Sequence, residues 1–364
     1  MKKTLLSLAV IAVSLSACNT TPKYTINGVV EGEQTGNVYL VKSAGEAMDT
    51  LAKAAIAEGK FVLTGTIDSL TDAYIIIEGK RGGTPIFVEN VAYTATLNPA
   101  SPADNKIEGT PNQALANQYA AISNEMRKGQ AALYKEYSIA SQGKDEEKMQ
   151  QIEEQFNKLS EEAQTKEAEL TKANSDSYIA AYMLASKMGS YESDVLVAKF
   201  DELGANAKIS APGKKIAERI QKVATVAVGQ VAPDFTLNTP EGQPLAMHSI
   251  KAKVKVLDFW ASWCGPCRGE NPNVVKVYNE FHPKGLEILS ISLDNDKEAW
   301  LKAIEDDKLT WNHVSDLKGW QSEAAQLYAV NGIPHVIVLD ENNVIVAKNL
   351  RGEKLKEKIA EMLK

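Results

Sequence analysis

The chain has 364 residues, which is enough for two or three domains. Its hydrophobic content of 44% is ordinary for a globular protein that buries a core. A formal net charge of −7, without a basic stripe, argues against a role in binding nucleic acid.

The N-terminus has the pattern of an export signal rather than of a folded segment. Two early lysines precede an apolar run, residues 5–15, that is too short to span a bilayer as a helix of the mature protein. Residues 15–18, Leu-Ser-Ala-Cys, resemble a lipobox, at which the signal peptide (residues 1–17) is removed and lipid is attached to Cys18. We therefore expect a lipid-anchored protein of the cell envelope that faces the periplasm. The lack of an acid directly after Cys18 favours the outer membrane, and cleavage as a plain signal peptide is the alternative.

A tether, residues 18–23, leads into a region with β character, residues 24–110. Its candidate strands are short, rich in Val, Ile, Thr and Tyr, and bounded by Gly, Asn, Asp or Pro. They cover residues 24–30, 37–41, 60–67, 73–78, 84–88 and 92–97. Their regular spacing predicts a small antiparallel domain, built as a sandwich or an open barrel. It contains no catalytic constellation.

Residues 111–226 form a region with helical character, and Pro111 is a plausible start signal. Between positions 145 and 172, apolar residues recur in steps of three and four and so share one helix face. They are Met149, Ile152, Phe156, Leu159, Ala163 and Leu170. This face indicates either a coiled-coil surface for a partner or a solvated helix packed on its neighbours, and we favour the second. Further helices are expected at 178–188, 194–203 and 211–226.

The last domain, residues 227–364, contains the chemically distinctive stretch. Val254–Phe259 is an apolar run typical of a buried strand. Cys264-Gly-Pro-Cys267 then turns the chain into a helix, because a proline suits the first helical turn. Cys264 would lie at the helix N-terminus, where free N–H groups and the helix dipole stabilise a thiolate. The spacing of the two cysteines therefore predicts thiol–disulfide exchange.

The sequence Asp258-Phe-Trp-Ala-Ser-Trp-Cys-Gly-Pro-Cys267 resembles the active site of the thioredoxin superfamily, and the resemblance extends over residues 226–364. Glu270 and the following Asn-Pro are similar to the TlpA/ResA branch, which is membrane-tethered and extracytoplasmic. Residues 232–237, Ala-Pro-Asp-Phe-Thr-Leu, resemble the opening strand of TlpA-like proteins and peroxiredoxins. The resemblance implies a strand–helix–strand unit followed by strand–strand–helix.

The β region has a resemblance of its own. Residues 58–61, Glu-Gly-Lys-Phe, with Gly65 and with residues 107–112, Ile-Glu-Gly-Thr-Pro-Asn, are similar to an N-terminal domain often found ahead of lipid-anchored thioredoxin modules. The expected fold class is thus multidomain: an N-terminal antiparallel β domain, a central α-helical region and a C-terminal α/β thioredoxin-like fold.

The family resemblance also implies where a substrate binds. A proline at the place of Pro334 carries a cis peptide bond that faces the cysteine pair in this family. The backbone of Ile333 would then pair with an incoming peptide as a short β-strand. His335 departs from the threonine that is common at its place. Trp263, next to Cys264, is expected to line the substrate rim, and Trp260 is expected in the core.

Two carboxyl groups compete for the proton-handling role, and both are candidate catalytic residues. Asp258 lies on the buried strand, where burial raises the pKa of a carboxyl and lets it accept the proton of the resolving thiol. Glu270 lies three residues after Cys267, within reach on the helix. Of the two, we favour Asp258.

The predicted function is a thiol–disulfide oxidoreductase of the cell envelope, acting as a disulfide reductase on protein substrates. Cys264 would attack the substrate and Cys267 would resolve the mixed disulfide. No metal or organic cofactor is expected. Because the chain has no flavin or nicotinamide fingerprint, an upstream redox protein must donate the electrons. The dipeptide Gly265-Pro266 is shared with reducing thioredoxins and favours reduction.

Three alternatives remain open. The first is a zinc half-site or a static disulfide; a zinc site normally needs a second Cys or His pair, which the sequence lacks. A thiol peroxidase of the peroxiredoxin class has a threonine three residues before its cysteine and a proline four before that, where this chain has Ala261 and Leu257. Finally, the β and helical regions could make this a non-enzymatic binding protein.

Overall fold

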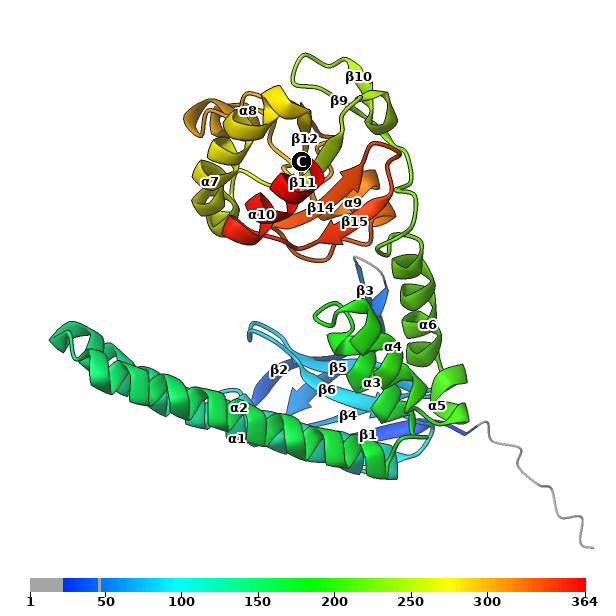
Figure 1. The fold of residues 1–364 in the computed structure, drawn as a ribbon. Helices are drawn as coiled ribbons and strands as arrows, with labels where there is room; N and C mark the ends of the chain where they lie inside the picture. The colour runs from blue at the N-terminus through cyan, green and yellow to red at the C-terminus, as the bar shows by residue number, and fades with distance from the viewer. Residues whose placement is uncertain (1–21, 45–46) are drawn as a thin grey trace, which may run out of the picture. The chain divides into compact units, whose positions relative to one another are not determined.

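The computed structural model of the protein describes residues 22–44 and 47–364 (Figure 1). The signal segment and Cys18 lie outside the described residues. The chain forms two compact units, which divide between Thr171 and Lys172. None of the described helices has both the length and the apolar character needed to cross a membrane.

The N-terminal β region is one sheet of eight strands, in the order β6-β5-β2-β3-β4-β1-β7-β8. Neighbouring strands are antiparallel except β1 and β7, which are parallel. The antiparallel β domain is therefore confirmed, with all strands in one continuous sheet. The strands are β1 Tyr24–Val30, β2 Thr35–Ala44, β3 Ala47–Ala57, β4 Lys60–Gly65, β5 Thr71–Ile77, β6 Thr84–Val88, β7 Ala92–Leu97 and β8 Lys106–Glu108.

The sequence analysis missed two of these strands, β3 and β8. The β3 sequence is rich in alanine, which disguises the alternation expected of a strand. Ile56 is nevertheless buried, and its neighbours Ala55 and Ala57 are exposed. Pairing with β2 along almost the whole length of β3 fixes the strand. β8 has only three residues, too few for a visible pattern.

Two long helices, α1 (Pro111–Gly143) and α2 (Glu146–Ala173), follow the sheet and run side by side (Figure 1). The side chain of Thr110 caps α1 by accepting a hydrogen bond from the backbone N–H of Gln113. Along the pair, Tyr134 packs edge-on against Phe156. The apolar face of α2 thus packs in part on its neighbour, as the simpler interpretation of the helix pattern predicts.

Four shorter helices belong to the second compact unit. They are α3 Tyr178–Lys187, α4 Ser193–Asp201, α5 Ala205–Ile209 and α6 Ala211–Ala224. Small and branched apolar side chains make their common core, among them Ala180, Leu196 and Ile216. The helical region therefore divides between the two units: α3–α6 share a unit with the C-terminal domain.

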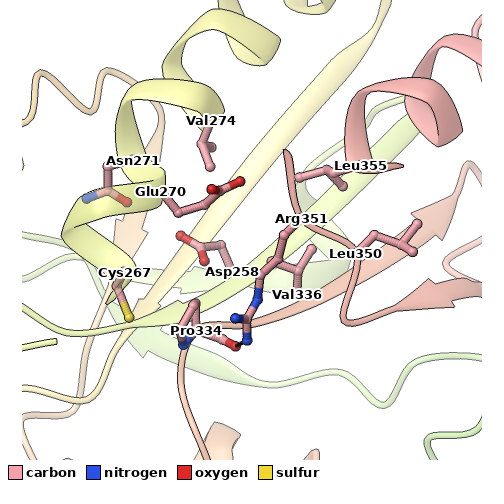
Figure 2. A pocket seen from close by; sticks show the side chains of 10 residues that line it. All are labelled: Asp258, Cys267, Glu270, Asn271, Val274, Pro334, Val336, Leu350, Arg351 and Leu355. Atoms are coloured by element: carbon pink, nitrogen blue, oxygen red, sulfur yellow. Dashed lines mark hydrogen bonds between the residues drawn. The ribbon is translucent and has the colours of Figure 1, made fainter. Parts of the chain in front are cut away.

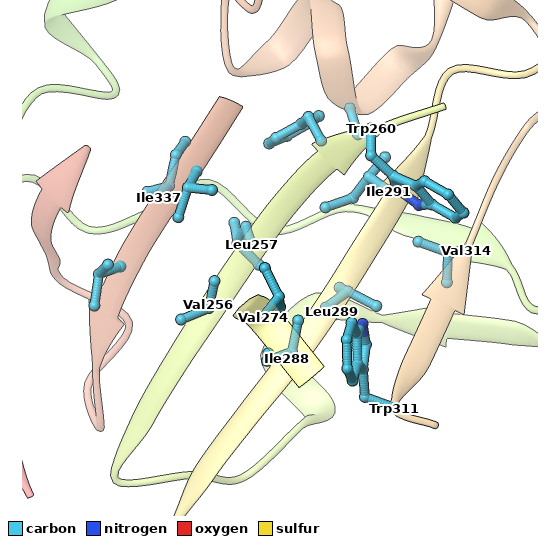
Figure 3. Close-up of a cluster of buried hydrophobic side chains, with 14 of the residues drawn as sticks. Val256, Leu257, Trp260, Val274, Ile288, Leu289, Ile291, Trp311, Val314 and Ile337 are labelled. Carbon is cyan, nitrogen blue, oxygen red and sulfur yellow. The ribbon is translucent and has the colours of Figure 1, made fainter. Parts of the chain in front are cut away.

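The C-terminal domain contains a five-stranded sheet in the order β13-β12-β11-β14-β15. β11, β12 and β13 are parallel, whereas β14 and β15 are antiparallel to their neighbours. The central strand, β11, is buried along its whole length, and large apolar side chains surround it (Figure 3). The elements are β11 Val254–Trp260, α7 Gly265–Phe281, β12 Leu286–Ser292, α8 Lys297–Asp306, β13 Asn312–Val314, α9 Glu323–Leu327, β14 His335–Asp340, β15 Ile345–Lys348 and α10 Gly352–Met362.

This order of elements matches the thioredoxin-like expectation, with two differences in detail. The segment 311–318 contains a short edge strand, β13, which three residues form by pairing with β12. A small hairpin of β9 (Thr236–Asn238) and β10 (Pro244–Ala246) precedes the sheet.

Candidate active site

The cysteine pair lies where β11 leads into α7. β11 ends at Trp260, and Cys264 is the N-cap residue of α7. The backbone N–H of Cys267 donates a hydrogen bond of 3.2 Å to Sγ of Cys264. The two sulfur atoms form a disulfide, with 5.3 Å between the Cα atoms. The helix N-terminus therefore directs an N–H group at the sulfur that would carry the thiolate charge.

The surroundings of the two sulfurs differ. Cys264 keeps 4% of its surface exposed and Cys267 only 1%, so the first cysteine is the more accessible one. Trp263, which directly precedes Cys264 in the chain, is exposed, and its ring centroid lies 6.2 Å from that of the exposed Trp320. Trp260 is fully buried in the core, as expected.

Asp258 lies on the central strand and is buried. The hydroxyl of Ser290 donates a hydrogen bond of 2.8 Å to its Oδ2. Burial raises the pKa of Asp258 to about 6; the Ser290 bond opposes the rise, and the nearby charge of Glu270 adds to it. Asp258 is thus a carboxyl that can exchange a proton near neutral pH.

Glu270 is half-buried, and both of its carboxylate oxygens have partners. Oε1 accepts a hydrogen bond of 2.7 Å from the backbone N–H of Gly352, at the start of α10. Oε2 accepts one of 3.2 Å from Nδ2 of Asn273. The position fits a carboxylate at a helix N-terminus, which the helix dipole stabilises.

The two carboxyls, Cys267 and Pro334 converge on one small cavity. Figure 2 shows Asp258 reaching it from β11, Glu270 and Cys267 from α7, and Pro334 from the turn directly before β14. The cavity has a volume of about 10 Å³, roughly the space that one water molecule needs. Asp258 and Cys267 thus line the same water-sized cavity.

The peptide bond between Ile333 and Pro334 is cis. The carbonyl oxygen of Pro334 accepts a hydrogen bond of 2.7 Å from Arg351, which fastens this turn to the start of α10 (Figure 2). Pro334 lines the same cavity as Cys267, so this cis bond lies near the second cysteine.

The sequence analysis missed the charged group that holds α7 in place. The guanidinium of Arg268 binds both carboxylate oxygens of Asp307, and Nδ2 of Asn271 donates to Asp307 at 2.6 Å. Burial raises the pKa of Asp307, but the hydrogen bonds from Arg268 and Asn271 and the charge of Arg268 together outweigh it, so the pKa is lowered. No sequence pattern marks Asp307, which follows α8 and meets Arg268 and Asn271 only in the folded chain.

In the described chain, no group of His, Cys, Asp and Glu side chains gathers as metal ligands do.

Comparisons with known proteins agree with this chemistry. The family described as AhpC/TSA matches residues 228–348, and a domain of unknown function, DUF4369, matches residues 24–116. The thiol-disulfide oxidoreductase ResA of Geobacillus thermodenitrificans is 33% identical over 38% of this chain and 77% of its own length. The thioredoxin-like protein YneN of Bacillus subtilis is 34% identical over 34% of this chain and 72% of its own length.

A solved structure is also similar. The C-terminal domain of a putative thiol-disulfide oxidoreductase from Bacteroides thetaiotaomicron is 37% identical, with a TM-score of 0.37. The match covers 39% of this chain and 97% of the solved chain. The assignment of this chain to a family is based on the two sequence relatives, ResA and YneN. With its cysteine pair, the chain belongs to the ResA-like thiol-disulfide oxidoreductases of the thioredoxin superfamily.

Proposed function

We propose that this oxidoreductase is a disulfide reductase of the cell envelope that acts on protein substrates. The observation that carries the proposal is the convergence of Cys267, Asp258 and Pro334 on one cavity behind Cys264. A nucleophile, a resolving thiol, a proton acceptor and a peptide-binding backbone are then within one site.

The reaction starts from the reduced pair. The Cys264 thiolate attacks one sulfur of the substrate disulfide, whose S–S bond breaks as a mixed disulfide forms, and the other substrate sulfur leaves as a thiolate that takes up a proton. The Cys267 thiolate then attacks Sγ of Cys264, and the second substrate thiol is released. The substrate has gained two electrons, and the enzyme is left with the Cys264–Cys267 disulfide.

Each neighbouring group has a role in these steps. The N-terminus of α7 stabilises the Cys264 thiolate; lowering a thiol pKa from about 8.5 to about 7 takes roughly 2 kcal/mol. Asp258 accepts the proton of Cys267 before resolution. Trp263 and the backbone of Ile333 and Pro334 bind the substrate segment that carries the disulfide.

The return to the dithiol state requires a second redox protein, whose own dithiol becomes oxidised in exchange. The place of this cycle follows from the N-terminal sequence: we propose that lipid on Cys18 holds the protein on a membrane facing the periplasm, with the outer membrane favoured. The basis is the lipobox-like sequence that ends at Cys18.

Reduction of insulin by the pre-reduced protein tests the activity, and a Cys267→Ala variant tests the substrates. This variant cannot resolve the mixed disulfide, so proteins captured on Cys264 in cells are identified directly. Cys264→Ser is the matched control and should capture none by this route. Rapid consumption of peroxide without insulin reduction would instead support the peroxidase alternative. Wild-type cellular function of a Cys264→Ser, Cys267→Ser double variant would support the binding-protein alternative.

A further inference from the structure

A second, larger hollow lies beside the cis-proline turn, within the C-terminal compact unit. It has a volume of about 360 Å³, and we refer to it as the cationic cleft. Ile333 and Pro334 line one side of it, the start of α4 lines another, and Arg219 reaches it from α6. The cleft is therefore continuous with the turn that would bind the substrate backbone.

Three positively charged side chains gather at this cleft: Arg219, Lys348 and Arg351. Each donates a hydrogen bond to a backbone carbonyl, respectively that of Ala329 at 2.8 Å, Val226 at 3.2 Å and Pro334 at 2.7 Å. Among the described residues, none of the three forms an ion pair with a carboxylate. Their charges are held in place by the backbone, and the charge of the nearby Glu192 offsets them only in part.

His335 also lines the cleft, and the three positive charges affect the pKa of its imidazole. Burial, together with the smaller effect of the charges of Lys348, Arg351 and Arg219, lowers its pKa to about 4. His335 is therefore neutral at physiological pH and adds no positive charge of its own. Of the described residues that line the cleft, one is acidic: Glu192, which is exposed. The cleft thus carries a formal charge of about +2 in a chain whose net charge is −7.

The cleft also offers unused hydrogen-bond donors. No side-chain hydrogen bond caps the N-terminus of α4, where Glu192 and Ser193 line the cleft. A helix N-terminus with free N–H groups favours an anion. The positive charges and the free N–H groups at the start of α4 therefore both favour a negatively charged ligand.

We infer that the cationic cleft binds an acidic segment of the substrate protein, adjacent to the cysteine whose disulfide is reduced. A peptide paired with the backbone of Ile333 has one of its flanks directed into the cleft, because Ile333 and Pro334 line it. Asp or Glu side chains on that flank meet Arg219 and Lys348. Helices α4 and α6 thus give the thioredoxin-like domain a wall that selects substrates by charge. The inference rests on the proposed function and names its substrate class.

The test uses three peptide disulfides, each a symmetric dimer, identical except that the residues flanking the cysteine on one side are Glu, Gln or Lys. A second set carries the same changes on the other side. The pre-reduced full-length protein is mixed with each, and the second-order rate of reduction is measured. We expect the order Glu, Gln, Lys, with about a tenfold advantage of Glu over Gln on the flank that enters the cleft. The advantage should shrink as ionic strength rises.

Variants locate the effect in the cleft. Arg219→Gln and Lys348→Gln should each reduce the ratio of the Glu rate to the Gln rate several-fold. Lys214→Gln is the matched control: Lys214 is an exposed lysine on the same helix that does not line the cleft, and this variant should keep the wild-type ratio.

Equal rates for the three peptides in both sets would overturn the inference and leave the proposed function standing. A charge preference that survives in both cleft variants would also overturn it. Failure to reduce any peptide would overturn the proposed function, and this inference with it. The peptide series on the wild-type protein decides the matter even if a variant does not fold.

Discussion

The hydroxyl of Ser290 donates a hydrogen bond of 2.8 Å to Asp258, its partner in register across the parallel strands β12 and β11. The indole N–H of Trp311 donates to the same hydroxyl oxygen at 2.9 Å, so the one hydroxyl proton is directed at the carboxyl. Asp258 thus has a fixed partner in the core, yet burial still raises its pKa to about 6. Because burial outweighs the hydrogen bond from Ser290, Asp258 can gain and lose a proton near neutral pH, which is the basis of its proposed proton-handling role.

Asp258→Asn should slow the resolution of the mixed disulfide by roughly 10–100 fold, because the general base is lost. In the wild-type protein the rate should rise as pH increases through about 6, where Asp258 loses its proton and becomes able to accept the proton of Cys267. The variant should lack this rise. Single-turnover reduction of insulin against pH measures both effects, and an unchanged profile in the variant would contradict the role.

The same substitution should stabilise the oxidised protein at neutral pH. A carboxyl whose pKa is raised by folding lowers the stability of the folded state wherever it is ionised in the unfolded chain. This cost is absent below about pH 4, grows as pH rises to about 6, and is then constant at up to about 3 kcal/mol. Denaturant melts of wild type and Asp258→Asn should agree at pH 4 and diverge by pH 7. Asparagine keeps an acceptor for Ser290, so packing changes little.

Local sequence signals predict much of the second unit. β11, the cysteine pair and the start of α7 follow from an apolar run, a proline in the first helical turn and a capping position, all within a few residues of one another. β13 was missed because it has only three residues, too few for a visible sequence pattern, and it forms as a strand only by pairing with β12. β3 was missed because alanine has no strong preference that marks a strand.

The ranking of the two carboxyls depends on partners that are distant in the sequence. Ser290 is 32 residues from Asp258, and Gly352 is 82 residues from Glu270. The cationic cleft is further removed from sequence reasoning, since Arg219 bonds to Ala329 across 110 positions. Such groups form only when the tertiary fold brings them together, so no periodicity or spacing marks them.

In the reduced protein, Cys264 should react first with an alkylating agent near pH 7. The exposed fractions of the two cysteines, 4% and 1%, differ little, so the preference comes mainly from the thiolate that the N-terminus of α7 stabilises. Mass-spectrometric mapping after brief alkylation identifies the labelled residue. Cys264→Ser should label slowly, and preferential labelling of Cys267 in the wild type would reverse the assigned roles.

The mature protein should be bound to a membrane through lipid on Cys18. A single acyl chain binds a bilayer only marginally, but a bacterial lipoprotein carries several, so the anchor should be stable. Cys18→Ser should move the protein from the membrane fraction to the soluble or unprocessed fraction. Wild-type protein recovered without lipid and fully soluble in the envelope would refute the anchor.

Glu270→Gln should affect the reaction less than Asp258→Asn, and in a different way. Glutamine keeps an oxygen that can accept the 2.7 Å hydrogen bond from the backbone N–H of Gly352, so the start of α10 should stay in place. The substitution removes a negative charge that contributes to the raised pKa of Asp258. The rise in rate should therefore move to lower pH while its height is kept. Glu270→Ala, which also loses the bond to Gly352, separates the two contributions: it should show the same shift together with lower stability in denaturant melts. If the rise disappears in Glu270→Gln and persists in Asp258→Asn, Glu270 is the proton acceptor and the ranking of the two carboxyls is wrong.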